Sequence, residues 1–245
     1  MTDDRSALYI EVPPTLTRAF ANELLAKLDG ITDATQLVIF AGQSADVFCL
    51  GMDLESTSTS RESEHSEGLR AIGKALIAVH GCALPTVAVV RGRAVGGGVG
   101  IAAACDWVIA EEGATFALPE MLWGFVPAAI WPLVVERIGP ARARRWAMTA
   151  CARDAAGARE AGLVAEVVRA GESTQALRRS MRQLLRVDRH AIGMLRAWTE
   201  DVARMPVAAA IAKGAERSAD QLADERVQAR LRSFFIDGDV PWRTS

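Results

Sequence analysis

The strongest constraint on the fold is a repeated alternation between short, wholly apolar segments and helical segments. Gln36–Phe40 (QLVIF), Thr86–Val90 (TVAVV) and Trp107–Ala110 (WVIA) each have the length of a strand and no polar face. Strands of this kind are typical of a sheet that is covered on both faces. Helical patterns separate them, which indicates parallel strands joined by helical crossovers. The sequence therefore predicts an α/β protein.

The ends of the chain differ in pattern. Near the start we predict a strand at Leu8–Glu11 and a helix at Leu16–Leu28 closed by Gly30. The residues from Leu177 onward are almost all helical in pattern, with apolar positions three and four residues apart. We therefore expect an α/β core over residues 1–185 and a helical region over residues 186–245.

The middle of the chain holds further expected elements. The polar stretch Glu55–Glu67 predicts a mobile surface loop. Helices are predicted at Gly68–His80, Gly98–Cys105 and Asp154–Ala161, the last of these capped by Gly162, and a last strand at Leu163–Val168.

Composition excludes several classes of function. The net charge of −2 argues against nucleic acid or an anionic membrane as a partner. The four cysteines form no CxxC pair and the three histidines do not cluster, so we expect neither a disulfide framework nor a metal site. An acidic N-terminus without an apolar stretch, and no apolar run long enough to span a bilayer, predict a cytoplasmic protein.

A run of glycines, Gly96-Gly97-Gly98-Val99-Gly100, follows a predicted strand and opens a predicted helix. Such a junction presents unpaired backbone N–H groups at the positive end of a helix dipole and can hold negative charge. The spacing does not match a dinucleotide fingerprint or a phosphate-binding P-loop. From the residues alone, close helix–sheet packing and an anion site remain equally open.

Two further short motifs carry polar groups at turns. Gly51-Met52-Asp53 follows a predicted strand, where a glycine turn with Asp53 as a helix N-cap is the simpler interpretation. Pro119-Glu120 is typical of a helix start, where an acid favours the positive end of the dipole. Apolar residues follow Glu120, and a carboxyl among them would have a raised pKa, as a general base requires. They are Met121, Leu122, Trp123 and Phe125.

Taken together, these motifs resemble the crotonase (enoyl-CoA hydratase/isomerase) superfamily. The resemblance also covers residues 85–110, the segment WGFVPAAIWPLVVERIG (123–139) and the segment ARDAAGAREAGLVAEVV (152–168). It implies a crotonase-like spiral of ββα turns with a C-terminal helical trimerisation region, forming a homotrimer or a dimer of trimers. It also implies an acyl-thioester site in which the backbone N–H groups of Met52 and Gly97 form an oxyanion hole.

The resemblance assigns the acid–base chemistry to Glu120. Hydratases of the family use a second glutamate at the position of Gly100, which this chain lacks. One carboxylate can remove an α-proton and return it to a leaving hydroxyl, or move a proton between two carbons. The loss of the second acid thus speaks against hydration of linear enoyl thioesters and leaves dehydration or isomerisation open.

The segment Pro127–Pro132 departs from simple hydratases, and with FFIDGDVPW (234–242) it resembles the dehydratases of polyketide β-branching. These act on 3-hydroxy-3-methylglutaryl groups carried by an acyl-carrier protein. We therefore expect a lyase whose substrate is carried on coenzyme A or acyl-carrier protein, with no resident cofactor. The alternatives are an isomerase, a related decarboxylase, and a non-enzymatic scaffold or RNA-binding member. Six residues are expected to line the pocket: Gly51, Asp53, Gly96, Gly100, Trp123 and Trp131.

Overall fold

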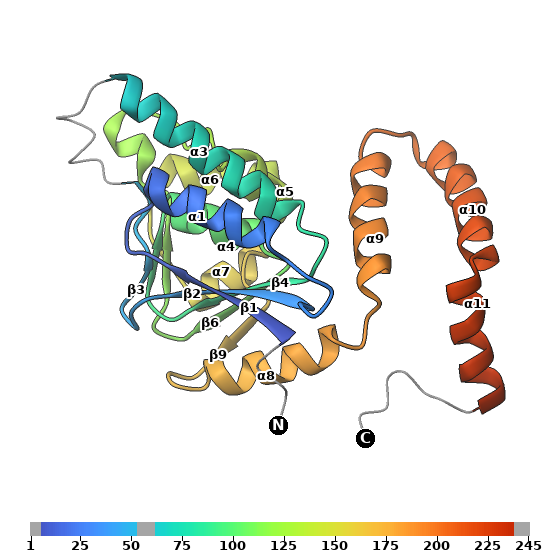
Figure 1. The fold of residues 1–245 in the computed structure, drawn as a ribbon. Helices are drawn as coiled ribbons and strands as arrows, with labels where there is room; N and C mark the ends of the chain where they lie inside the picture. Colours follow the sequence, from blue (N-terminus) through green and yellow to red (C-terminus); the bar gives the residue numbers. More distant parts are fainter. Residues whose placement is uncertain (1–5, 53–61, 238–245) are drawn as a thin grey trace. The chain divides into compact units, whose positions relative to one another are not determined.

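A five-stranded parallel sheet forms the framework of the first part of the chain (Figure 1). The computed structural model describes residues 6–52 and 62–237. The strand order is β1-β2-β4-β6-β9, which requires a crossover between each pair of neighbours. The strands are β1 (Ala7–Val12), β2 (Leu37–Gly42), β4 (Thr86–Val90), β6 (Trp107–Glu111) and β9 (Glu166–Val168). The predicted α/β class is confirmed.

Both faces of this sheet are buried, as the uninterrupted apolar strands predict. Because side chains alternate along a strand, Val38, Phe40 and Ala88 lie on one face, and Leu37 and Ile39 on the other. The first face packs against apolar residues of α1 (Arg18–Asp29), α3 (Glu62–His80) and α4 (Gly97–Ala104). The second face is covered by α8 (Ser173–Leu184), on the opposite side of the sheet in Figure 1.

A second, four-stranded sheet has the order β3-β5-β7-β8. Its strands are β3 (Val47–Cys49), β5 (Arg93–Val95), β7 (Thr115–Ala117) and β8 (Arg153–Asp154). Each of the pairs β2/β3, β4/β5 and β6/β7 thus places one strand in each sheet before the chain enters helical structure. This repetition is the ββα spiral. Strands of two or three residues are too short to show a period, and the sequence did not predict them.

Several predicted boundaries are wrong. The helix expected from Leu16 begins at Arg18, because Leu16 instead forms a parallel bridge with Met52 and Thr17 caps the helix by accepting a hydrogen bond from Phe20 N–H at 3.1 Å. Part of the predicted loop Glu55–Glu67 is helical, since α3 begins at Glu62, and residues 55–61 lie outside the described residues. The predicted strand Leu163–Val168 shortens to β9.

Helices fill the remaining chain. Before α8, the helices not yet named are η2 (Glu120–Trp123), α5 (Trp131–Ile138), α6 (Pro140–Thr149) and α7 (Ala155–Ala161). The helical tail divides into α8, α9 (Arg189–Val202), α10 (Val207–Ala223), α11 (Glu225–Arg232) and a π-helical turn, η3 (Ser233–Asp237).

The chain forms two compact units, residues 1–185 and 186–245. The second unit contains α9, α10 and α11, which have no buried residue. The first unit carries the hydrophobic core and the candidate site.

Candidate active site

The glycine turn at the end of β5 brings backbone donors to the start of α4. Gly96 adopts φ 52° and ψ −112°, a backbone conformation that favours glycine. Its N–H donates to Ala117 O at 2.9 Å, which ties the turn to β7, and its carbonyl accepts the first helical bond from Gly100 N–H at 3.0 Å. Gly97 follows as the first residue of α4, where an amide has no acceptor within the helix.

The Gly51 loop packs directly against this turn. Gly51 has φ 84°, and a Cβ built on it would lie 3.0 Å from Gly97 N and 3.1 Å from Val95 O. Leu16 N–H donates to Gly51 O at 2.8 Å, which holds the loop in place. The amides of Met52 and Gly97 donate to no other described residue, and both residues are half-buried. Two N–H groups without a described acceptor therefore lie close together, one after the Gly51 turn and one at the start of α4.

Glu120 is the first residue of η2 and its carboxyl lies against the glycine turn. A Cβ built on Gly96 would lie 2.9 Å from Glu120 Oε1, so the missing side chain at Gly96 leaves room for the carboxyl. Glu120 is only 9% exposed, and its Oε2 is buried without a hydrogen-bond partner among the described residues. Burial raises the pKa of the Glu120 carboxyl, and a hydrogen bond from its own amide opposes that rise. A buried carboxyl with a raised pKa and one oxygen without a described hydrogen-bond partner has the properties of a general base.

The apolar residues after Glu120 are more exposed than a wall around its carboxyl would suggest. Leu122, Trp123 and Val126 are 70%, 59% and 62% exposed, and Met121 and Phe125 are also exposed. The short helix η2 ends at Gly124, whose φ of 80° turns the chain. Much of the surface of these residues faces solvent, while the Gly96 turn, distant in sequence, lies against the carboxyl.

The other predicted site residues are distributed unevenly. Gly51, Gly96 and Gly100 are buried, and Trp131 is half-buried against the core. Trp123 lies in the exposed segment, and Asp53, with its predicted capping role, lies outside the described residues.

Sequence reasoning missed Leu16 and Ile130. Leu16 was assigned to a helix, although it anchors the Gly51 loop, and Ile130, at the start of α5, lies against Gly100. The sequence difference from simple hydratases at Pro127–Pro132 was the one feature that could have drawn attention to Ile130.

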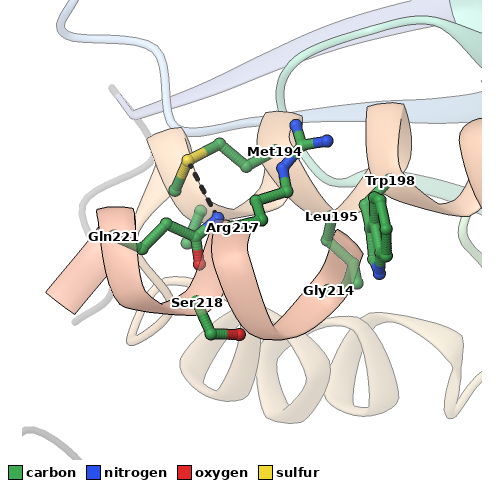
Figure 2. A pocket seen from close by; sticks show the side chains of 8 residues that line it. Met194, Leu195, Trp198, Gly214, Arg217, Ser218 and Gln221 are labelled. Atoms are coloured by element: carbon green, nitrogen blue, oxygen red, sulfur yellow. Dashed lines mark hydrogen bonds between the residues drawn. The ribbon is translucent and has the colours of Figure 1, made fainter. Parts of the chain in front are cut away.

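The second unit contains a separate pocket of about 320 Å³ between α9 and α10 (Figure 2). Trp198, Leu195 and Met194 form its apolar wall, and Arg217 lies over the Trp198 ring at 5.2 Å. Gln221 Nε2 donates to Met194 Sδ at 3.6 Å. No aspartate, glutamate or histidine lines this pocket, so it offers no acid–base pair for chemistry like that of Glu120.

No group of three or more histidine, cysteine, aspartate or glutamate side chains has the geometry of a metal site among the residues the structure describes. Within the same residues, no helix combines the length and hydropathy needed to cross a membrane.

The ββα spiral, with a buried acid beside a glycine turn, defines a crotonase-type enzyme. The family profile for enoyl-CoA hydratase/isomerase matches residues 11–244, and the chain belongs to this family.

Known proteins of this family are similar over most of the chain. "Probable enoyl-CoA hydratase echA17" of Mycobacterium avium is 30% identical over 216 residues, covering 86% of this chain and 83% of the relative. The bacillaene synthase dehydratase PksH of Bacillus subtilis is 24% identical over 234 residues, covering 95% and 89%. The solved structure of Pseudomonas aeruginosa AtuE superimposes with a TM-score of 0.84 at 26% identity, covering 98% and 97%. The chain is therefore an enzyme of the hydratase/dehydratase type.

Proposed function

We propose that the protein is a lyase that dehydrates a β-hydroxyacyl thioester of the 3-hydroxy-3-methylglutaryl-acyl-carrier-protein type, in polyketide β-branching. The observation that carries this proposal is the buried carboxyl of Glu120, whose Oε2 has no hydrogen-bond partner among the described residues. The neighbouring helix α4 carries no second acid. Similarity to a protein named as a bacillaene synthase dehydratase supports the choice of reaction.

The proposed reaction begins with proton removal. The Glu120 carboxylate takes the proton from the carbon next to the thioester, and the electron pair moves onto the thioester oxygen. The N–H groups of Met52 and Gly97 donate hydrogen bonds to this enolate oxygen. Each such donor is worth about 3–4 kcal/mol in comparable sites.

The second step completes the elimination. The enolate re-forms the carbonyl, the C–O bond at the β-carbon breaks, and the hydroxyl leaves with the proton held by Glu120. The products are the α,β-unsaturated thioester and water, and the Glu120 carboxylate is regenerated. One carboxylate serves both steps when both groups lie on the same face of the substrate.

Two alternatives use the same residues. An isomerase would move a double bond within an enoyl thioester, and a decarboxylase would release carbon dioxide to form the same enolate. Mass spectrometry of the acyl product separates the three: dehydration removes water, decarboxylation removes carbon dioxide, and isomerisation leaves the mass unchanged. We expect loss of water from a 3-hydroxy-3-methylglutaryl thioester; an unchanged hydroxyacyl substrate, beside turnover of an enoyl or carboxylated one, would refute the lyase assignment.

The acyl carrier is part of the substrate, and the proposed reaction needs no cofactor besides it. We propose acyl-carrier protein as the carrier, with coenzyme A as the alternative. The same acyl chain presented on the two carriers distinguishes them, because a carrier-protein enzyme will show the higher kcat/KM with the protein-bound form.

We also propose that the chain assembles as a homotrimer through residues 186–245. Helices α9, α10 and α11 contain no buried residue. Two large apolar residues of α10, Val207 and Ile211, are 75% and 68% exposed. These two residues are four apart and therefore share one face of α10. An exposed apolar stripe of this kind is typical of a surface that another chain covers.

Substitution of Ile211 by glutamate tests this assembly. We expect Ile211→Glu to shift the mass measured by analytical ultracentrifugation from trimer toward monomer, because the charge would be desolvated at the interface. Ala209→Glu, on the opposite face of the same helix, should leave the trimer intact. A monomeric wild-type protein would contradict the proposal.

A further inference from the structure

Gly100 of α4 packs directly against the side chain of Ile130, the residue before α5. A Cβ built on Gly100 would lie 2.9 Å from Ile130 Cβ, and closer still to its Cγ2. The same position lies 3.8 Å from Leu76 Cδ1 of α3. The space that a side chain at residue 100 would enter is therefore filled by aliphatic carbon.

This place is one helical turn from the Glu120 carboxyl. Gly100 N–H donates to Gly96 O at 3.0 Å, so the two glycines stand on successive turns of the same face. Gly96 meets Glu120 Oε1, and Gly100 meets Ile130. Along this face of α4, the Ile130 side chain therefore follows the Glu120 carboxyl, one helical turn further on.

Ile130 is held firmly where it is. It is 4% exposed, and its N–H donates to Pro127 O at 3.1 Å, while its own carbonyl accepts from Val134 N–H at 3.1 Å. Its β-branched side chain has little freedom at χ1. To make room for a side chain at residue 100, Ile130 would have to shift together with the start of α5.

We infer that Ile130 is a specificity-determining residue, which keeps a second acid–base group and its water away from Glu120. One carboxylate can run its own dehydration in reverse, but hydration that uses two acids needs the second acid to hold the attacking water, and that acid would stand at residue 100. An aliphatic site offers such a water no hydrogen-bond partner. The enzyme is thereby limited to substrates whose reaction one carboxylate can complete. This inference rests on the proposed function.

A thermal double-mutant cycle tests the packing without using activity. Gly100→Ala should lower Tm by a few degrees, roughly 2–8 °C, because overpacking outweighs the gain in helix propensity. In the Ile130→Ala background the same change should leave Tm equal or higher. Additive effects of the two substitutions would overturn the inference.

An activity comparison tests the specificity. Crotonyl-CoA serves as the linear enoyl probe, and its hydration is measured for the wild type, Ile130→Gly, Gly100→Glu/Ile130→Gly and Gly100→Gln/Ile130→Gly. We expect the Glu double variant to hydrate the probe about 10-fold or more faster than its isosteric Gln control. If Ile130→Gly fails to fold, Ile130→Ala carries the same comparison.

Two results would overturn the inference: a Glu double variant no faster than its Gln control, or rapid hydration of the probe by the wild type. Dehydration of the 3-hydroxyacyl thioester by the wild type is measured in the same preparations. If the wild type does not dehydrate this substrate, the proposed function is refuted. The thermal cycle would still test the packing of Gly100 against Ile130.

Discussion

Glu120→Gln is expected to abolish dehydration of the 3-hydroxyacyl thioester while leaving the fold intact. Glutamine keeps the size of the side chain but cannot accept the α-proton, and general acid–base catalysis contributes about 10²–10⁴-fold to such rates. The measurement is kcat by product mass spectrometry, with circular dichroism as the check on folding. The control is Glu112→Gln, an exposed residue directly after strand β6. Full activity in Glu120→Gln would exclude the proposed mechanism.

The same variant should be more stable than the wild type at neutral pH. Burial raises the pKa of Glu120 in the folded state, so the folded protein binds more protons than the unfolded chain between the two pKa values. Wild-type stability relative to Glu120→Gln therefore falls as pH rises from about 4.3, the ordinary glutamate pKa, through the raised value. Tm measured across this pH range provides the test, and a Tm of the variant below that of wild type at neutral pH would contradict burial of the charge.

Gly51→Ala is expected to reduce kcat by about 10²-fold, the effect of losing one oxyanion donor. A Cβ at Gly51 would meet Gly97 N at 3.0 Å and Val95 O at 3.1 Å, and both are backbone atoms that cannot rotate away. The Met52 and Gly97 amides must then move apart. KM should change less than kcat, because these donors act chiefly on the developing enolate.

Gly171→Ala is the matched control for Gly51→Ala. Gly171 has φ 83°, almost the same as the 84° of Gly51, but a Cβ there would meet nothing within 4 Å. Both variants therefore carry similar backbone strain, and only Gly51→Ala disturbs the amides. Equal kcat in the two variants would show that the Gly51 loop does not position a donor.

The sequence alone was sufficient for the elements of the large sheet. The apolar segments Gln36–Phe40, Thr86–Val90 and Trp107–Ala110 correspond to β2, β4 and β6 within a residue or two. This was possible because burial on both faces leaves a local signal, a continuous apolar run. The glycine turn and Glu120 were also identifiable, since glycine and proline punctuate the chain locally.

Only the tertiary structure decided what surrounds Glu120. The apolar residues that follow it in sequence are exposed, and the backbone of Gly96, on the neighbouring ββα turn, shelters the carboxyl. Likewise, the family resemblance shows that an acid is missing at Gly100, but only the structure shows that the Ile130 side chain fills the space. Local patterns report which residues turn or pair along the chain, whereas the desolvation of a polar group depends on which distant backbone packs against it, and that is set by the assembled sheets and helices.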